Sequence, residues 1–310
     1  MDILFILLLA IALDLAFGEP PNAIHPVAWM GKFIGLLERG NKSQSPKLQF
    51  LYGMLMVLLT LGIFTAAVGL ILFYLKSFNF AAYIIVGAVL LKLSLSLKGL
   101  KQAAIKVRNL LQSEKPEEAR RELRAMVSRE THHLPPPLLV SATVESVAEN
   151  TVDSFIAPLF YFLLFGVPGA VAYRVVNTLD SMVGYHGKYE YLGKCASRLD
   201  DILNYIPARL AAMLLALAAF LSRKNGRAAW QVALREHVNT ESPNAGWPMA
   251  ATAGALNVQL EKVGQYKLGK TGNPLVPETI DASLELAQIA MGFWILLCCI
   301  TGVVYFVLTA

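Results

Sequence analysis

The sequence predicts an all-α integral membrane protein, a polytopic bundle of helices that crosses the bilayer several times. Hydrophobic residues make up 55% of the 310 residues and charged residues only 16%, and the mean hydropathy is +0.51. An ordinary soluble domain carries about 25% charged residues, so that class is excluded. Apolar segments near the ~20 residues needed to cross a bilayer recur along the chain. They are residues 3–17, 51–75, 80–97, 155–176, 205–221 and 289–308.

The first apolar segment, residues 3–17, is short enough to resemble a signal peptide. It lacks the basic leading region and the small-residue cleavage site of such peptides, so we expect a retained membrane helix. The three cysteines are Cys195, Cys298 and Cys299, and their spacing suits neither a disulfide framework nor a zinc site. We expect them to serve as packing residues.

Basic residues gather in the connections between apolar segments. Residues 98–129 hold nine lysines and arginines, residues 222–288 hold seven and residues 18–50 hold four, whereas the connection 77–79 has none. Because bases in short loops set the orientation in the bilayer, we expect these segments, and the active site with them, on the cytoplasmic side of the cell membrane. Topology alone accounts for the net charge of +5, and nothing in it requires a nucleic-acid partner.

A break is predicted inside the fourth apolar segment, at Gly166-Val167-Pro168-Gly169. Broken helices at membrane depth occur where they line protein or a wet cavity, so we expect a re-entrant hairpin or a cavity-lining segment. A single straight crossing would place the polar residues 177–204 outside the cell, whereas a hairpin would shift the side of everything downstream. The sequence leaves this topology open.

The chain reads as one membrane domain, residues 1–310, with a cytoplasmic helical insert at about 98–140. Apolar residues at helical spacing predict helices over 98–112 and 116–128, with Pro116 in an early helical position, and Pro135-Pro136-Pro137 interrupts any helix that precedes residue 138. Alternation of apolar and polar residues over 256–268, around Val263-Gly264-Gln265, predicts a small β-hairpin outside the bilayer.

The most informative polar pattern is a series of three carboxylates, Glu145, Glu149 and Asp153, spaced four residues apart. On a helix they share nearly one face, where like charges destabilise each other by about 0.2–0.5 kcal/mol per pair. Something cationic should therefore face them, either arginine or lysine side chains from elsewhere or a hard cation such as Mg²⁺. A merely solvated helix face is the alternative.

Two further polar clusters follow the broken segment. The first has side chains that can coordinate a cation or donate to phosphate, and the second offers an arginine fork beside two carboxylates. Arg198 could instead simply pair with one of those neighbouring aspartates. The candidate residues in these clusters are Asn177, Asp180, Tyr185, Lys188, Lys194, Arg198, Asp200 and Asp201.

Two more clusters flank apolar segments. Asp14 and His25 lie at the end of the first segment and just after it, where Asp14 could be a functional buried carboxylate or only a helix cap, and His25 a ligand contact or an ordinary loop residue. Asn244 and Trp247 precede an alanine-rich helix whose N-terminus could present amides to an anion. Trp247 could equally be an anchor at the membrane interface.

A literal P-loop pattern occurs at residues 264–271, G-Q-Y-K-L-G-K-T. A functional P-loop must run into a helix. Here Gly272-Asn273-Pro274 follows directly and no βαβ alternation surrounds it, so we do not expect a phosphate site of this kind.

These motifs together resemble a known family. The segments S-A-T-V-E-S-V-A-E-N-T-V-D-S, N-T-L-D-S-M-V-G-Y, A-S-R-L-D-D and S-P-N-A-G-W-P-M-A-A, with D-L-A-F-G-E-P-P and H-P-V near the start, are similar in order and spacing to the adenosylcobinamide-phosphate synthase family of cobalamin biosynthesis, the CobD/CbiB type. The similarity runs from about Leu13 to beyond Gly269.

The resemblance implies an ATP-dependent ligase that joins a carboxylate of adenosylcobyric acid to the amine of aminopropanol phosphate, or of threonine phosphate, to give adenosylcobinamide phosphate. It implies ATP and Mg²⁺ as co-substrate and metal, the corrinoid as substrate, and contact with the lipid bilayer and with other late cobalamin-biosynthesis enzymes. The chain shows no standard ATP-binding fold.

Roles for individual residues follow from the resemblance as hypotheses. Glu145, Glu149 and Asp153 would bind Mg²⁺ with Asn150 and Asp180 nearby, and Asp200 or Asp201 would be a second metal ligand or a base. Lys194 and Arg198 would hold phosphate, with Asn177, Lys188, Asn244 and Asp14 as further substrate-binding candidates. His25, Tyr185 and Trp247 are candidate contacts for the corrin ring. The alternative function is a corrinoid-binding membrane scaffold or transporter, because carboxylates beside a broken helix also describe a solute pathway.

Overall fold

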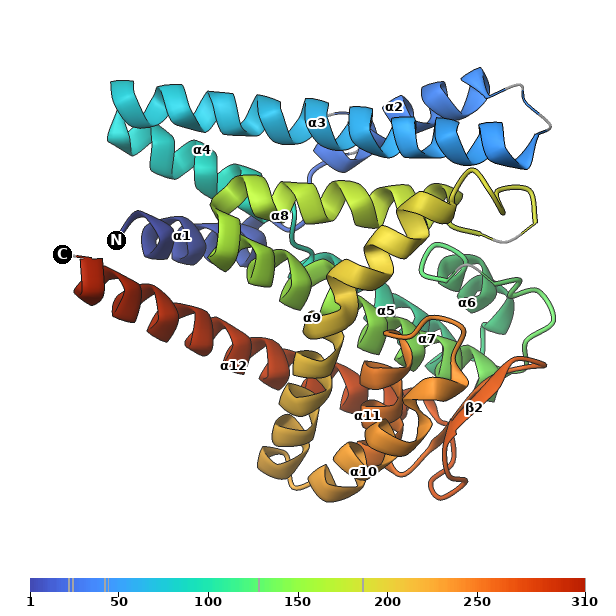
Figure 1. Ribbon diagram of the computed structural model, residues 1–310. Helices are drawn as coiled ribbons and strands as arrows, with labels where there is room; N and C mark the ends of the chain where they lie inside the picture. The colour runs from blue at the N-terminus through green and yellow to red at the C-terminus, as the bar shows by residue number, and fades with distance from the viewer. Residues whose placement is uncertain are drawn as a thin grey trace. The chain divides into compact units, whose positions relative to one another are not determined.

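The computed structural model describes the chain except residues 22, 24, 42, 44, 128, 186 and 310, and it is dominated by α-helices, with one small β-sheet (Figure 1). Lys42, part of the basic segment 18–50, lies outside the described residues. The elements are α1 (Asp2–Phe17), α2 (Pro26–Gly40), α3 (Pro46–Phe78), α4 (Phe80–Lys92), α5 (Leu97–Gln112), α6 (Pro116–Leu123), α7 (Pro136–Thr151), a π-helical turn (Val152–Ile156), α8 (Ala157–Val183), α9 (Lys194–Leu221), α10 (Gly226–Glu236), a 3₁₀ turn (His237–Asn239), α11 (Gly246–Leu256), β1 (Gln259–Lys262), β2 (Tyr266–Gly269) and α12 (Pro277–Thr309).

The all-α class with several membrane-length helices is confirmed. Among the described residues, five helical stretches are long and apolar enough to cross a membrane, namely Pro46–Phe78, Phe80–Gln112, Pro136–Val183, Lys194–Leu221 and Pro277–Leu308. They contain all but the first of the expected apolar segments. That first segment forms α1, which has 16 residues and so falls short of the ~20 needed for a crossing. Its place in the membrane stays a prediction.

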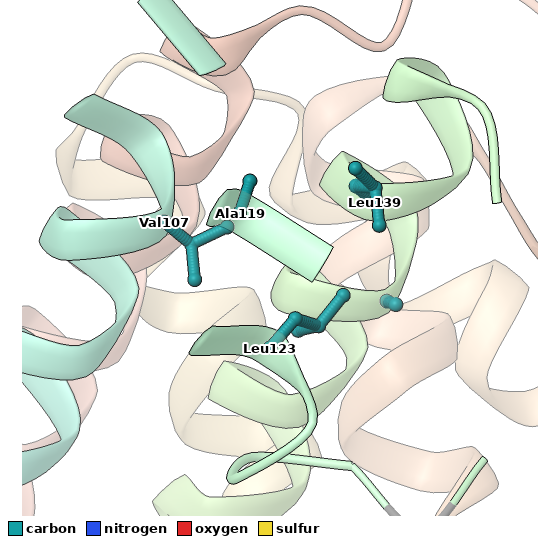
Figure 2. Close-up of a cluster of buried hydrophobic side chains, with 5 residues drawn as sticks. Val107, Ala119, Leu123 and Leu139 are labelled. Carbon is teal, nitrogen blue, oxygen red and sulfur yellow. The ribbon is translucent and has the colours of Figure 1, made fainter. Parts of the chain in front are cut away.

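The chain divides into two compact units, which are described separately. One comprises Met1–Ser96, Ala157–Leu203 and Cys298–Ala310, and the other Leu97–Ile156 and Asn204–Leu297. The expected insert, residues 98–140, falls wholly in the second unit. Its helices α5 and α6 pack on α7 through Val107, Ala119, Leu123, Leu139 and Ala142, all essentially excluded from solvent (Figure 2).

The second insert helix is shorter than expected. Pro116 occupies its first turn as predicted, but the helix ends at Leu123 instead of residue 128, which lies outside the described residues. The last turn tightens, because the amides of Ala125 and Met126 bond to carbonyls three residues back, on Glu122 and Leu123. Such i→i+3 bonds are a common way for a helix to end.

The expected break in the fourth apolar segment is confirmed, and it is a reversal of the chain. Gly166 has φ 68° and ψ −163°, a conformation that glycine tolerates and residues with a Cβ rarely adopt. The rings of Tyr161 and Tyr173 stack with centroids 5.5 Å apart. Twelve residues of straight helix would separate them by about 18 Å, so the two arms of α8 lie against each other as a helical hairpin (Figure 1). How this hairpin sits in the bilayer stays a prediction.

The small β-hairpin is also confirmed. Strands β1 and β2 pair antiparallel, with Lys262 opposite Tyr266, and the three intervening residues include Gly264 at φ 75°. A glycine in the left-handed region is typical of three-residue hairpin loops. The P-loop-like residues 264–271 therefore form a turn and a strand, and no helix follows until Pro277. This agrees with the rejection of a P-loop from the sequence.

Candidate functional site

The first of the three carboxylates, Glu145, is buried on α7 and bound from three sides. Its side chain is 3% exposed. Arg129 forms an ion pair with Oε2, the Tyr266 hydroxyl donates to Oε2 at 2.7 Å, and Ser141 Oγ donates to Oε1 at 2.7 Å. The cation expected opposite the carboxylate series is therefore, at this position, an arginine.

This network joins α7 to the β-hairpin. Arg129 also donates to the carbonyl of Glu261, and the Glu261 amide donates to Ser141 Oγ at 2.8 Å. Burial and the negative charge of Glu145 both raise the pKa of Tyr266, so its hydroxyl keeps its proton and remains a donor. Glu145 thus holds β1 and β2 against α7.

The other two carboxylates of the series lie in different surroundings. Glu149 is exposed, and Asp153 is half-buried within the π-helical turn Val152–Ile156. The regular α-helix that the spacing predicts therefore ends at Thr151, before Asp153. Such π-helical turns are frequent at functional sites. Asn150 lies between them and donates from Nδ2 to the Ser146 carbonyl at 2.9 Å, and its Oδ1 accepts from Ser154.

In the other unit, the two polar clusters that follow the broken segment come together. Asn177 Nδ2 on α8 donates to Asp200 Oδ1 on α9 at 3.4 Å. The Ser197 side chain hydrogen-bonds to Asp180, and the charge of Asp201 acts on Asp180. Residues from N-T-L-D and S-R-L-D-D, about 20 positions apart, therefore form one acidic cluster. They were predicted as two separate clusters because no local sequence pattern indicates that α9 packs back on α8.

The basic residues predicted to hold phosphate lie at the margin of this cluster. Arg198 is 3.7 Å from Asp201, and its side chain is 74% exposed. It therefore makes the local ion pair that was the alternative reading, and its exposure leaves most of the guanidinium open to solvent. Lys194 and Tyr185 are exposed. Their substrate-binding roles stay predictions.

Lys188 has a structural partner. Its Nζ lies 3.0 Å from Glu38 Oε1 on α2, and the Tyr189 hydroxyl donates to the same oxygen at 2.7 Å. Hydrogen bonds from Tyr189 and then Lys188 lower the pKa of Glu38. The segment 187–191 is thereby joined to α2, a contact that the sequence did not reveal.

Asp14 and His25 belong to one charged network with Lys92. Asp14 is fully buried, and its Oδ1 is 4.0 Å from Lys92 Nζ, which also donates to the Gly18 carbonyl. Glu19 accepts from His25 Nε2 at 2.9 Å. Burial opposes ionisation of Glu19, but hydrogen bonds from His25 and Ser96 and the charge of Lys92 outweigh it and lower the pKa of Glu19.

His25 is also a helix cap. Its Nδ1 accepts from the Val27 amide at 3.2 Å at the start of α2, so both ring nitrogens are engaged. A role as a corrin contact would therefore use the ring face or displace one of these bonds. Lys92 was missed in the sequence, although a lysine inside an apolar segment is a recognised signal for a buried pair.

Asn244 and Trp247 are both buried, at 5% and 7% exposure, so Trp247 is packed within its unit. Its indole stacks on His237, with ring centroids 4.0 Å apart. The N-terminus of α11 offers few amides to an anion, contrary to expectation. The Trp247 amide bonds to the Asn244 carbonyl, residue 248 is a proline, and the Met249 amide bonds to Ala245. Asn244 Oδ1 instead lies 3.3 Å from Arg209 Nη1.

Two observations bear against the hypothesis that all three carboxylates of the series bind Mg²⁺. Among the described residues, no group of three or more His, Cys, Asp or Glu side chains is close enough to hold a metal ion. Both oxygens of Glu145 are occupied by Arg129, Tyr266 and Ser141. Mg²⁺, however, is commonly held by only one or two carboxylates together with waters and substrate phosphates. The oxygen donors of Glu149 and Asp153 suit that coordination, so a magnesium role for these two stays a prediction.

Comparisons with known proteins agree along the whole chain. A family model described as "CobD/Cbib protein" matches residues 7–307. The "Cobalamin biosynthesis protein CobD" of Dehalococcoides mccartyi is 53% identical over 306 residues, covering 99% of both chains. The "Probable cobalamin biosynthesis protein CobD" of Methanothermobacter thermautotrophicus is 41% identical, covering 92% of this chain and 93% of that one. The protein of that name from Thermococcus kodakarensis is 40% identical, covering 93% and 92%. No solved structure matches.

Proposed function

This chain belongs to the CobD/CbiB family of cobalamin biosynthesis proteins, and from that premise we propose that it is an adenosylcobinamide-phosphate synthase. It joins a carboxylate of adenosylcobyric acid to the amine of aminopropanol phosphate or threonine phosphate and consumes ATP. The observation that carries the proposal is the match over residues 7–307, because it includes every acidic and basic cluster described above. Its active site faces the cytoplasm, where the basic segments are expected.

Formation of the amide bond requires an activated carboxylate and a deprotonated amine held in position. ATP with Mg²⁺ would supply the first, because transfer of its terminal phosphoryl group to the corrin carboxylate, with release of ADP, would give the carboxylate phosphate as its leaving group. Holding the two reactants in the correct geometry provides a large part of the rate enhancement of such a step. The acidic cluster of Asp180, Asp200 and Asp201 is suited to the second task, because carboxylates attract the ammonium form of the amine and can accept its proton.

The exposed Glu149 and the half-buried Asp153 are the residues that would hold Mg²⁺ beside the nucleotide phosphates. Glu145 takes the different task of fixing α7 against the β-hairpin. Asp153 lies in the π-helical turn that directly follows α7, the helix that carries Glu149.

The test is turnover by the detergent-purified protein, following nucleotide hydrolysis and corrinoid mass together. With adenosylcobyric acid and aminopropanol phosphate, we expect a condensed corrinoid and ATP consumption, each dependent on both substrates. Tight corrinoid binding with neither product nor hydrolysis would overturn the proposal in favour of a scaffold or transporter.

A matched pair of variants tests the role of the carboxylate series. Glu149→Gln should abolish amide formation, because it removes the charge that would hold Mg²⁺. Glu118→Gln, a half-exposed position on α6 in the same unit, should leave the rate unchanged. Full activity of Glu149→Gln would exclude the metal role.

A further inference from the structure

Two aromatic rings contact Arg209, a residue on α9 that neither the motifs nor the proposed chemistry include. The guanidinium carbon of Arg209 lies 3.5 Å from the Tyr205 ring centroid and 4.9 Å from that of Trp247. Trp247 in turn stacks on His237. A guanidinium over two aromatic faces gains cation–π attraction from both.

Hydrogen bonds from Nη1 also help to orient the guanidinium. Nη1 lies 2.6 Å from the Tyr205 carbonyl and 3.3 Å from Asn244 Oδ1. In the part of the chain that the structure describes, neither Nε nor Nη2 has a hydrogen bond, and no carboxylate forms an ion pair with Arg209. The edge that carries Nε and Nη2 is thus the part of the fork left for a ligand.

The surroundings make this an unusual place for a single positive charge. Arg209 lies inside Lys194–Leu221, a stretch long and apolar enough to cross a membrane. Ionisable residues in such stretches are costly and are usually paired or functional. The buried Nε1–H of Trp247 is a second donor without an acceptor among the described residues. A buried donor without an acceptor is destabilising.

We propose that Arg209 is a phosphate-binding residue that grips a substrate phosphate through its Nε–Nη2 edge, with Tyr205, Trp247 and Asn244 holding the fork in position. The planar fork matches two oxygens of a phosphate group, and two parallel N–H···O bonds add geometric selectivity to the attraction of charge. That the phosphate belongs to the amine substrate rests on the proposed function. The terminal phosphates of ATP are the other source of the same chemistry.

Calorimetric titration of the full-length protein in detergent tests the site without any turnover. The probes are inorganic phosphate, aminopropanol phosphate, ATP and aminopropanol without its phosphate. We expect inorganic phosphate and aminopropanol phosphate to bind competitively, and aminopropanol not to displace them. Arg209→Gln should weaken both at least tenfold and Arg209→Lys by an intermediate factor, because lysine keeps the charge but loses the fork. Competition by ATP alone would support the site and assign the phosphate to the nucleotide.

The matched control is Arg227→Gln, which removes the same charge from an exposed position on α10 in the same unit. It should bind phosphate within twofold of the unaltered protein, and all variants should share its melting temperature to within a few degrees. Phosphate binding of unchanged strength in Arg209→Gln, displacement by aminopropanol, or no phosphate binding by the unaltered protein would each overturn the proposal. Arginine-dependent phosphate binding without amide formation would instead leave this site standing and reject the synthase assignment.

Discussion

Glu145 and Asp180 are both carboxylates on long helices, but they differ in burial and in the charge of their neighbours. Glu145 is buried, and an arginine, a tyrosine and a serine engage its oxygens. Asp180 is half-buried and lies near a second carboxylate, Asp201, with a serine hydroxyl as its neutral partner. The first arrangement stabilises the fold. The second gathers negative charge in one place, which costs stability and is useful where a cationic substrate or metal must be bound.

The largest expected effect is the loss of Glu145. Glu145→Ala leaves the mostly buried Arg129 without its counter-charge, and breaking one partner of a buried pair typically costs about 3–5 kcal/mol. We expect a fall of that size in the free energy of unfolding, measured by denaturation in mixed detergent micelles. Glu130→Ala, on the neighbouring loop and exposed, is the control and should cost less than about 1 kcal/mol. Equal stability of the two variants would show that Glu145 is no anchor.

The next effect concerns the opposite member of the comparison. Asp180→Asn relieves like-charge repulsion, so we expect stability within about 1 kcal/mol of the unaltered protein. Amide formation should nevertheless fall at least about 100-fold, which corresponds to about 2.7 kcal/mol in the barrier. Turnover assays and unfolding measured on the same preparation separate the two quantities. An Asp180→Asn variant that is destabilised but keeps its activity would contradict the catalytic role of Asp180 and assign it a structural one, like that of Glu145.

A smaller effect is expected when only one of the partners of Glu145 is changed. Tyr266→Phe keeps the ring but removes the hydroxyl that donates to Oε2 at 2.7 Å. A hydrogen bond to a charged group contributes about 1.5–3 kcal/mol, and Arg129 remains in place, so we expect a loss near the lower end of that range. Hydrogen exchange in β1 and β2 should increase in step. Unchanged exchange would mean that the hairpin is held without this bond.

The smallest effect is a pH dependence at Glu38, which has a cationic and a neutral partner. Tyr189 and Lys188 lower its pKa, so the ionised form favours the folded state. This contribution is present above the ordinary glutamate value of 4.5 and is lost as the pH falls through the lowered pKa of the folded protein. Tyr189→Phe should therefore flatten the fall in melting temperature on acidification below pH 4.5. A parallel shift of the curve at every pH would contradict this origin.

Local patterns in the sequence determined most of the secondary structure of this protein. Runs of apolar residues predicted the membrane-length helices, Gly264 between alternating residues predicted the β-hairpin, and Gly166 with Pro168 predicted the break in α8. In each case the cause lies within a few residues, because backbone conformation and side-chain periodicity are local properties. The order of the motifs was enough to indicate the family, since it depends only on residue identity and spacing.

Tertiary structure alone decided the partners of the charged residues. Arg129 and Tyr266 lie 16 and 121 positions from Glu145, and Asn244 lies 35 positions from Arg209. Three carboxylates at equal spacing looked equivalent along the helix, yet one is buried in an ion pair, one is exposed, and the third is half-buried in a π-helical turn. The physical reason is that a side chain's charge state and its free hydrogen-bonding edges depend on what packs around it. That packing brings together elements that are far apart along the chain, and the local sequence of one element does not indicate which other element it contacts.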